Sequence, residues 1–323
     1  MPQSHLLKGL ALLSLSAFLF ASMGVFIRFA SHTVDNATVV FMRNLTGTLL
    51  LLPFALSQGK AFFKTDIIWM HLWRALVGLT AMYGFFYAIA HLPLSNAMVF
   101  TYSSPVFIPL VAWLFLKERI SGLMLIAALI GLMGVLLVAK PSDAMFNWLS
   151  LVGLSSSLLA SMAFVTVRAL TKTEPATRIV FYFCLISTII SAIPMFWHWR
   201  VLHSQELFYL VGAGTLATLS QVCLSKAYSY APAGKIGPAN YLAIIFAGIW
   251  AWLLWGEVPD NLSIAGMLLI LIALLFVNLS KAFSQLAPCP TLATSNVTEA
   301  AQYGVMYQFD VPNNGQFSGA AQV

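Results

Sequence analysis

Long apolar runs separated by short polar breaks dominate this sequence. A helix needs about 20 apolar residues to cross the hydrocarbon layer of a bilayer, and runs of roughly that length recur from end to end. The pattern predicts an all-α integral membrane protein. We expect ten transmembrane helices, near residues 7–29, 37–57, 69–90, 95–116, 122–139, 149–169, 176–196, 207–229, 236–256 and 262–281.

The two halves of the chain resemble each other at a constant shift of 139 residues. Ala21-Ser22-Met23 recurs as Ala160-Ser161-Met162. The same shift superposes further identical residues: Ala88 on Ala227, Pro93 on Pro232, Tyr102 on Tyr241, Ala112 on Ala251, Trp113 on Trp252 and Glu118 on Glu257. We therefore expect two five-helix repeats, residues 1–140 and 141–281. Because five is odd, the second repeat enters the membrane from the opposite side, so the repeats are inverted.

Inverted repeats are the architecture of many secondary transporters, whose substrate site lies near the membrane midplane between the repeats. The basic residues predict the orientation, since they concentrate in cytoplasmic loops. With the N-terminus inside, twelve basic residues fall at cytoplasmic helix ends, Arg74 among them, and four at outer ends: Arg28, Arg43, Lys140 and Arg200. Both termini are predicted to be cytoplasmic. Residues 282–323 are polar and predicted to form a disordered tail.

Composition narrows the function further. Apolar residues make up 60% of the chain and charged residues 8%, too few charges to cover a soluble surface. The 16 basic residues are scattered and form no patch, which argues against nucleic-acid binding. The three cysteines suggest neither disulfides nor a metal site. No phosphate-binding loop or zinc-protease motif is present, so neither an enzyme nor a cofactor is expected.

One further set of residues carries a family resemblance. The first half has Pro105 and Pro109 before the segment WLFLKER (113–119) and then GLMGV (131–135), and the second half has WLLWGE (252–257) and Gly266. With Arg28 and Arg43, these residues resemble the EamA family of the drug/metabolite transporter superfamily, over residues 7–281. The resemblance implies a ten-helix carrier in the bacterial inner membrane. It also implies a cavity lined by the first, third, fourth, sixth, eighth and ninth helices.

The halves depart from each other at two places. Gly256 and Val258 replace Lys117 and Arg119, and Ala243 and Ile244 replace Ser104 and Pro105. We expect the substrate site where the halves differ in this way.

Polar residues inside the apolar runs are the candidate substrate-binding groups, because such groups usually face the bundle interior or water. Gln221, Ser225 and Tyr228 share one face of their helix, as do Tyr83 and Tyr87 of theirs. Interhelical hydrogen bonding remains the alternative role for these groups. The full set of predicted substrate-binding residues is Tyr83, Tyr87, Asn96, Tyr102, Ser103, Ser161, Gln221, Ser225, Tyr228, Asn240 and Tyr241.

Pro105 and Pro238 are the predicted gating residues. A proline within a helix frees backbone carbonyls and produces a kink, and interruptions at corresponding places of two repeats are typical of a transporter site. The alternative, that each proline kink affects only helix packing and has no gating role, remains open. Arg28, Arg43 and Lys140 are interpreted as cations that extend to the headgroups, with attraction of an anion as the alternative.

All acidic residues fall in predicted loops, helix ends or the tail. This placement favours a facilitator or exchanger over a proton pump with a buried carboxylate relay. The predicted function is alternating-access transport of a small organic metabolite, an amino acid or a related amphipathic compound. Two alternatives stay open, uptake of a nucleotide-like or vitamin-like metabolite such as S-adenosylmethionine, and a membrane scaffold or receptor that transports nothing. The expected partners are the substrate and the lipid bilayer. Formation of a homodimer is a further possibility that the sequence leaves undecided.

Overall fold

The computed structural model of the 323-residue protein describes residues 3–30, 33–91, 100, 102–118, 122–140, 148–197, 200–256 and 258–286. The chain divides into two compact units, Met1–Lys281 and Ala282–Val323. The second unit is described only at residues 282–286, which end the last helix. The predicted disorder of the tail falls on residues outside the described part and stays a prediction.

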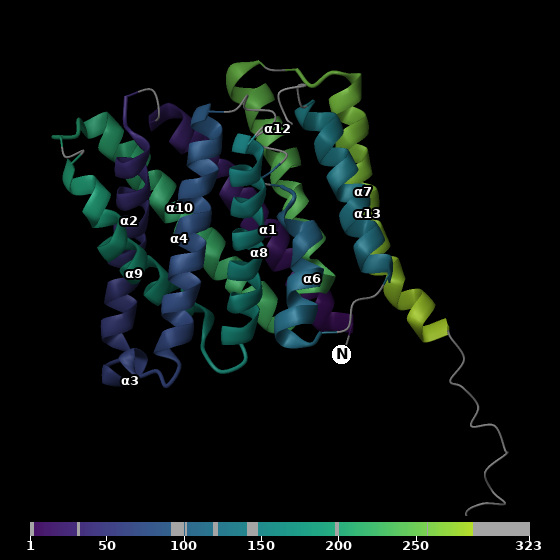
Figure 1. The fold of residues 1–323 in the computed structure, drawn as a ribbon, viewed down its shortest axis with the longest axis horizontal. Coiled ribbons are helices and arrows are strands. Elements are labelled where there is room, and N and C mark those ends of the chain that lie inside the picture. The colour runs from purple at the N-terminus through teal and green to yellow at the C-terminus, as the bar shows by residue number, and fades with distance from the viewer. Residues whose placement is uncertain are drawn as a thin grey trace, which may run out of the picture. The chain divides into compact units, whose positions relative to one another are not determined.

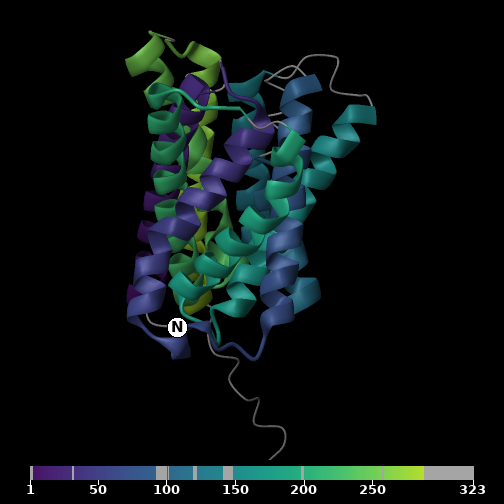
Figure 2. The same ribbon diagram turned by 90° about the vertical axis from the view of Figure 1, so that its left-hand side faces the viewer.

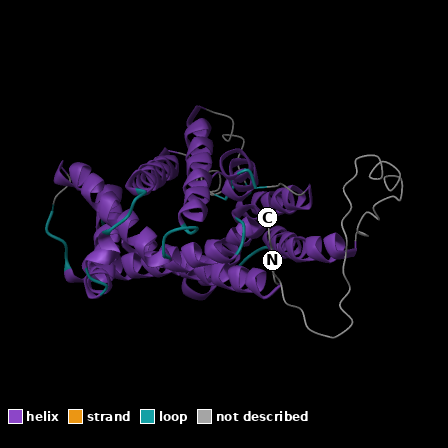
Figure 3. Ribbon diagram, turned by 90° about the horizontal axis from the view of Figure 1, so that it is seen from below, coloured by secondary structure: helices purple, strands orange, loops and turns teal. Residues whose placement is uncertain are grey.

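The described residues form helices and the loops between them, without a strand (Figure 3). In chain order the helices are α1 (Gln3–Ala30), α2 (Asn36–Ser57), α3 (Lys60–Phe63), α4 (Ile68–His91), α6 (Ser104–Leu116), α7 (Gly122–Ala139), α8 (Trp148–Leu170), α9 (Ala176–Trp197), α10 (Ser204–Tyr230), α11 (Ala233–Ile236), the 3₁₀ helix η2 (Gly237–Tyr241), α12 (Leu242–Trp255) and α13 (Asn261–Leu286). In Figures 1 and 2 the long helices of the first unit run alongside one another.

Seven helical segments of the described residues are long and apolar enough to cross a membrane. They are Ser4–Ala30, Asn36–Ser57, Gly122–Ala139, Leu151–Leu170, Ala176–Trp197, Ser204–Tyr230 and Ala233–Trp255. Ser104–Leu116 and Asn261–Ala273 are apolar but shorter. Each predicted span overlaps a described helix, so the predicted membrane-protein class is supported. The number of crossings stays a prediction.

Two of the predicted spans are interrupted. Tyr102 and Ser103 form a turn, and α6 begins only at Ser104, with Pro105 in its first turn. The span 236–256 is divided into η2 and α12, and Pro238 lies in the first turn of η2. Proline lacks the N–H that a helix interior requires, so both helices start afresh at these prolines. The two interruptions occupy equivalent places, because Tyr102 and Tyr241 are 139 positions apart.

Helix packing repeats between the two halves. At the shift of 139, α1, α2, α4, α6 and α7 correspond to α8, α9, α10, α12 and α13. α1 packs along α10, and the equivalent helices α8 and α4 pack along each other. α2 packs along α9, its own equivalent. The predicted boundary near residue 140 follows the end of α7, and residues 141–147 lie outside the described part.

α1 and its equivalent helix α8 run in opposite directions. The start of α1 lies beside the end of α10, where the rings of His5 and Tyr230 are 5.7 Å apart. The end of α8 reaches the same place, because Arg168 Nη1 donates to the Tyr228 carbonyl over 2.6 Å. α1 therefore begins where α8 ends. We call this end of the first unit the N-terminal end, and α3 lies at the same end (Figure 1).

The largest apolar core joins α1, α6, α8, α10 and α11 near the N-terminal end. It contains the fully buried side chains of Leu13, Ile108, Leu170, Tyr228 and Ile236. α10 packs against the other helices of this core, and it carries three of the predicted site residues.

Candidate functional site

The polar face of α10, formed by Gln221, Ser225 and Tyr228, lies inside the first unit. Gln221 Oε1 accepts a hydrogen bond from Arg74 Nη2 over 3.2 Å. Ser225 Oγ is buried without a hydrogen-bond partner among the described residues. Tyr228 is fully buried, and its hydroxyl accepts from Asn240 Nδ2 over 3.4 Å. Seven residues separate Gln221 from Tyr228, so the face extends about 10 Å along the helix.

The helix interruptions bring several predicted site residues together. Tyr102 and Tyr241 belong to one buried cluster with residues of α1, α7 and α12. The Tyr241 hydroxyl donates to the Ala128 carbonyl of α7 over 2.9 Å. Ser103 Oγ and Ser157 Oγ share a hydrogen bond of 2.8 Å, which joins the turn before α6 to α8. In this conformation Ser103 and Tyr241 therefore bond to the protein itself.

The remaining predicted residues are more dispersed. Ser161 is buried and donates to the Leu158 carbonyl of its own helix over 2.7 Å. The Tyr83 hydroxyl is buried without a hydrogen-bond partner among the described residues, whereas the Tyr87 side chain is exposed. Asn96 lies outside the described residues. The substrate-binding roles of all these residues stay predictions.

The sequence interpretation missed two interior cations. Arg74 was placed at a cytoplasmic helix end, but it lies almost two turns into α4 and is only 3% exposed. Arg43 was expected to extend to the headgroups, and this is wrong, because the side chain is 8% exposed and packs between helices. Its Nη1 lies 2.9 Å from the sulfur of Met82 in α4. Its position six residues beyond the start of its predicted run was the only signal in the sequence.

Four helices meet around these two arginines. Arg43 and Asn44 from α2, Phe183 and Cys184 from α9, and Ala217, Thr218 and Gln221 from α10 line one narrow space, and Arg74 reaches it from α4. The Arg74 guanidinium lies over the Phe183 ring, 4.1 Å from its centroid. The space is too narrow for a water molecule in this conformation. α2 and α9 thus contribute to it, although the family resemblance assigned no cavity lining to the corresponding second and seventh helices.

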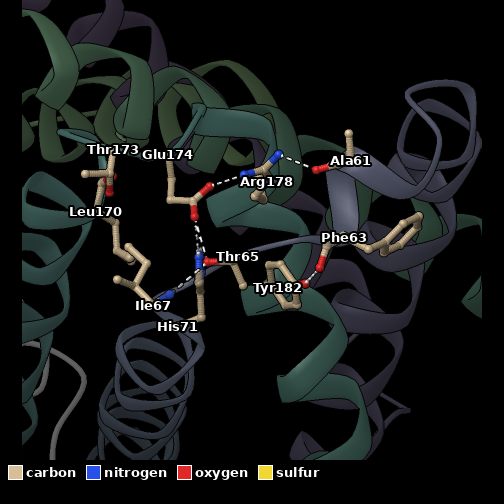
Figure 4. A network of polar contacts seen from close by, with 10 residues as sticks. All are labelled: Ala61, Phe63, Thr65, Ile67, His71, Leu170, Thr173, Glu174, Arg178 and Tyr182. Carbon is tan, nitrogen blue, oxygen red and sulfur yellow. Dashed lines mark hydrogen bonds and ion pairs between the residues drawn. The ribbon is translucent and has the colours of Figure 1, made fainter.

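A separate polar network ties the loops together at the N-terminal end (Figure 4). Glu174, in the loop between α8 and α9, accepts hydrogen bonds from Thr65 Oγ1 and Arg178 Nη1, both over 2.6 Å. His71 is fully buried, and its Nε2 lies 3.9 Å from Glu174 Oε1. The Tyr182 ring covers the His71 ring at 4.7 Å, and the Tyr182 hydroxyl donates to the Phe63 carbonyl. We call this set the Glu174 network. It fastens the start of α4 to α9.

Other ion pairs also lie at helix ends. Glu118 accepts from Arg168 Nε over 3.2 Å at the end of α6. Asp260 Oδ1 lies 2.6 Å from Lys140 Nζ, and this contact with Lys140 holds the pKa of Asp260 well below its usual range. Arg200 donates to Glu206 over 2.7 Å, and the same bond raises the pKa of Arg200. The described His, Cys, Asp and Glu residues form no cluster that could hold a metal ion.

Comparison with known proteins identifies the family. The model of the EamA-like transporter family matches residues 7–140 and, again, residues 147–279. The chain is 35% identical to the pseudopaline exporter CntI of Pseudomonas aeruginosa, with 85% of this chain and 97% of that protein covered. It is 25% identical to the S-adenosylmethionine uptake transporter of Rickettsia felis, with 85% and 94% covered. One solved crystal structure shares the fold, with a TM-score of 0.73, 16% identity, and coverage of 87% of this chain and 98% of that one. This chain is a multi-pass membrane protein that belongs to the EamA-like transporter family.

Proposed function

We propose that this chain is a carrier that moves a small amphipathic organic metabolite, such as an amino acid or a related compound, across the bacterial inner membrane. The observation that carries the proposal is the polar face of α10, on which Ser225 and Tyr228 are buried and Gln221 is partly buried. Its amide and hydroxyl groups lie within a helix that is apolar enough to cross a membrane. Polar groups are costly in hydrocarbon, and those that persist usually serve a substrate path or a helix contact.

Alternating access of two inverted five-helix repeats is the proposed mechanism. Support comes from the opposite directions of α1 and α8 and from the equivalent interruptions before α6 and α12. An open pocket at the N-terminal end is lined by residues of α6 and α11, including Pro109 and Gly234, whereas the space beside Arg43 is closed. Pro105 and Pro238 would flex at the interruptions as one side closes and the other opens.

The proposed orientation places both termini in the cytoplasm. Arg43 and Arg74 are interior residues, so eleven basic residues remain at the predicted cytoplasmic ends and three at the outer ends. The described members of the larger group include Lys60, which begins α3, Lys64, which follows α3, and Lys172 in the loop after α8. A bias of this size favours a cytoplasmic N-terminal end.

The proposed energetics are those of a facilitator or exchanger. Four described carboxylates lie at helix ends, and each forms an ion pair with an arginine or lysine there: Glu118, Glu174, Glu206 and Asp260. Carboxylates held in this way are structural. The proposal therefore couples transport to the substrate gradient and to no proton relay.

Counterflow into proteoliposomes tests the transport proposal. Purified protein is reconstituted in vesicles loaded with an unlabelled amino acid, and entry of the same labelled amino acid is followed, one proteinogenic amino acid at a time. We expect accumulation of at least one amino acid, and its loss in Gln221→Ala. Gln205→Ala is the matched control, because Gln205 is exposed and bonds only Tyr209 of its own helix among the described residues. If no amino acid enters, or if both variants transport equally, the proposal is wrong.

A further inference from the structure

Arg43 and Arg74 are two buried cations without a carboxylate partner among the described residues. We call them the arginine pair. Arg43 lies seven residues beyond the start of α2 and Arg74 six residues beyond the start of α4, so each is about 10 Å from a helix end. A guanidinium at that depth cannot reach the headgroups unless its side chain leaves the bundle. Buried charges are normally paired, because an isolated one is costly.

Four acids of the described residues are held elsewhere. Glu118 pairs with Arg168, Glu174 with Arg178 and Glu206 with Arg200. Asp35 caps α2 through the backbone N–H groups of Ala37 and Thr38. None of these carboxylates is available to the arginine pair.

Several N–H donors of the arginine pair have no acceptor among the described residues. A guanidinium carries five N–H donors. Among the described residues, Arg43 donates only to the Met82 sulfur, a weak acceptor, and Arg74 only to Gln221. The Nε of each arginine is buried without a partner. These donors point to an acceptor that the chain itself does not provide.

The local packing directs both cations to one place. Gln221 and Phe183 line the space beside Arg43, and the same two residues contact Arg74. Gly78 makes this possible, because a Cβ at that position would collide with the Arg74 guanidinium and lie 3.2 Å from the Phe183 ring. The absence of a side chain at Gly78 lets Arg74 turn toward α9 and α10.

The internal repeat indicates that the fold does not require the arginine pair, because the equivalent positions of the other half carry no cations. At the shift of 139, Arg43 corresponds to Tyr182, Arg74 to Ala213 and Gln221 to Met82. Both halves build equivalent helices, but only one half carries the cations. A charge that helix packing required would be expected in both copies, so we infer that the arginine pair serves a feature that the halves do not share.

We propose that the arginine pair is the subsite for a carboxylate of the transported metabolite, with Gln221 as the neighbouring hydrogen-bond partner and Phe183 as an apolar wall. The subsite rests on the proposed transport function. Guanidinium groups bind carboxylates through paired, charge-assisted hydrogen bonds, which would satisfy the Nε donors. The narrow space must widen to admit the carboxylate, so binding and the opening of the site are one event.

Ligand-induced thermal stabilisation of the purified protein tests the subsite. The probes are the proteinogenic L-amino acids and their N-acetyl derivatives, each beside its C-terminal amide, with inorganic phosphate as a further anion. We expect at least one free acid to stabilise the protein, and its amide to bind at least about tenfold more weakly. Arg43→Gln and Arg74→Gln should lose this binding, and Arg28→Gln, at the far end of α1 on the Trp255 ring, should keep it. Equal binding of acid and amide, stabilisation by phosphate alone, or no binding by any free acid would overturn the proposal.

The unliganded protein supplies a second readout. Removal of an uncompensated buried cation should raise the melting temperature of the unliganded protein, so Arg43→Met should melt higher than the wild type and still bind no carboxylate. A structural arginine would give the opposite shift. A lower melting temperature in Arg43→Met together with retained binding would refute the subsite.

The binding experiment tests the subsite and the counterflow experiment tests transport, so either proposal can fail without the other. A protein that binds free acids through the arginine pair but accumulates none of them disproves transport and leaves the subsite intact. A protein that accumulates an amino acid as well with Arg43→Gln as without it disproves the subsite alone.

Discussion

Gly131→Ala in α7 should destabilise the protein, because a Cβ at this position would fall on the ring of Tyr241. Tyr241 is fully buried, and its hydroxyl donates to the Ala128 carbonyl. Overpacking of this kind costs about 1 to 3 kcal/mol, and a buried hydroxyl that loses its partner costs about 1 to 3 kcal/mol more. The better helix propensity of alanine returns about 1 kcal/mol. The expected net loss is therefore about 1 to 5 kcal/mol.

Gly24→Ala is the matched control, since Gly24 also lies within a helix and has nothing within 4 Å of its Cβ position. That variant should gain up to about 1 kcal/mol from helix propensity alone. Reversible unfolding in mixed detergent micelles measures both free energies. The double variant Gly131→Ala with Tyr241→Leu should be less destabilised than the sum of the single variants, because the collision partner is gone. If Gly131→Ala and Gly24→Ala are equally stable, the proposed contact between Tyr241 and α7 is wrong.

Three further predictions concern the helix ends. Glu174→Gln should lower the free energy of unfolding by about 1 to 3 kcal/mol, because the carboxylate accepts two short hydrogen bonds, and an unchanged melting temperature would contradict this. Arg168→Gln should cost about 1 to 3 kcal/mol, and a double-mutant cycle with Glu118→Gln should show coupling rather than additivity. Lys140 holds the pKa of Asp260 below its usual range, so Asp260 contributes fully above its unfolded pKa and loses that contribution only as the pH falls through its lower folded pKa. The effect of Asp260→Asn on melting temperature should therefore be the same at pH 8 and pH 5, and a smaller effect at pH 5 would contradict the lowered pKa.

The helices were predictable because a membrane restricts the sequence so strongly. Backbone groups in hydrocarbon must be satisfied within the segment, which demands long apolar helices and leaves short polar breaks between them. The predicted span 176–196 and the observed α9, Ala176–Trp197, differ by one residue. The lengths of the helix interruptions before α6 and α12 were less predictable. The sequence suggested a kink at Pro105, whereas the helix begins only at Ser104, after a turn.

The side on which a polar residue faces was not predictable from the run alone. Ser161 looked like a cavity residue, yet its hydroxyl bonds to a carbonyl of its own helix, which any mid-helix serine can do. Arg74 looked like a helix-end cation because it lies near the start of its apolar run. Its burial follows from the small residue at Gly78 and from Gln221 on α10, a contact between residues 147 positions apart.

In our proposal, the arginine pair lets the two halves share a fold and still build one asymmetric site. Where a helix contact needs the same side chain in both copies, the residue is repeated, as with Tyr102 and Tyr241 in their common buried cluster. Where Gln221 meets Arg74, the equivalent pair is Met82 and Ala213, which can share neither charge nor hydrogen bonds. A carrier that changes its access side needs the symmetry for two equivalent conformations and the asymmetry for a single substrate orientation. In our proposal these two requirements fall to different residues, so we expect a substitution at the arginine pair to change the substrate while the helix packing stays intact.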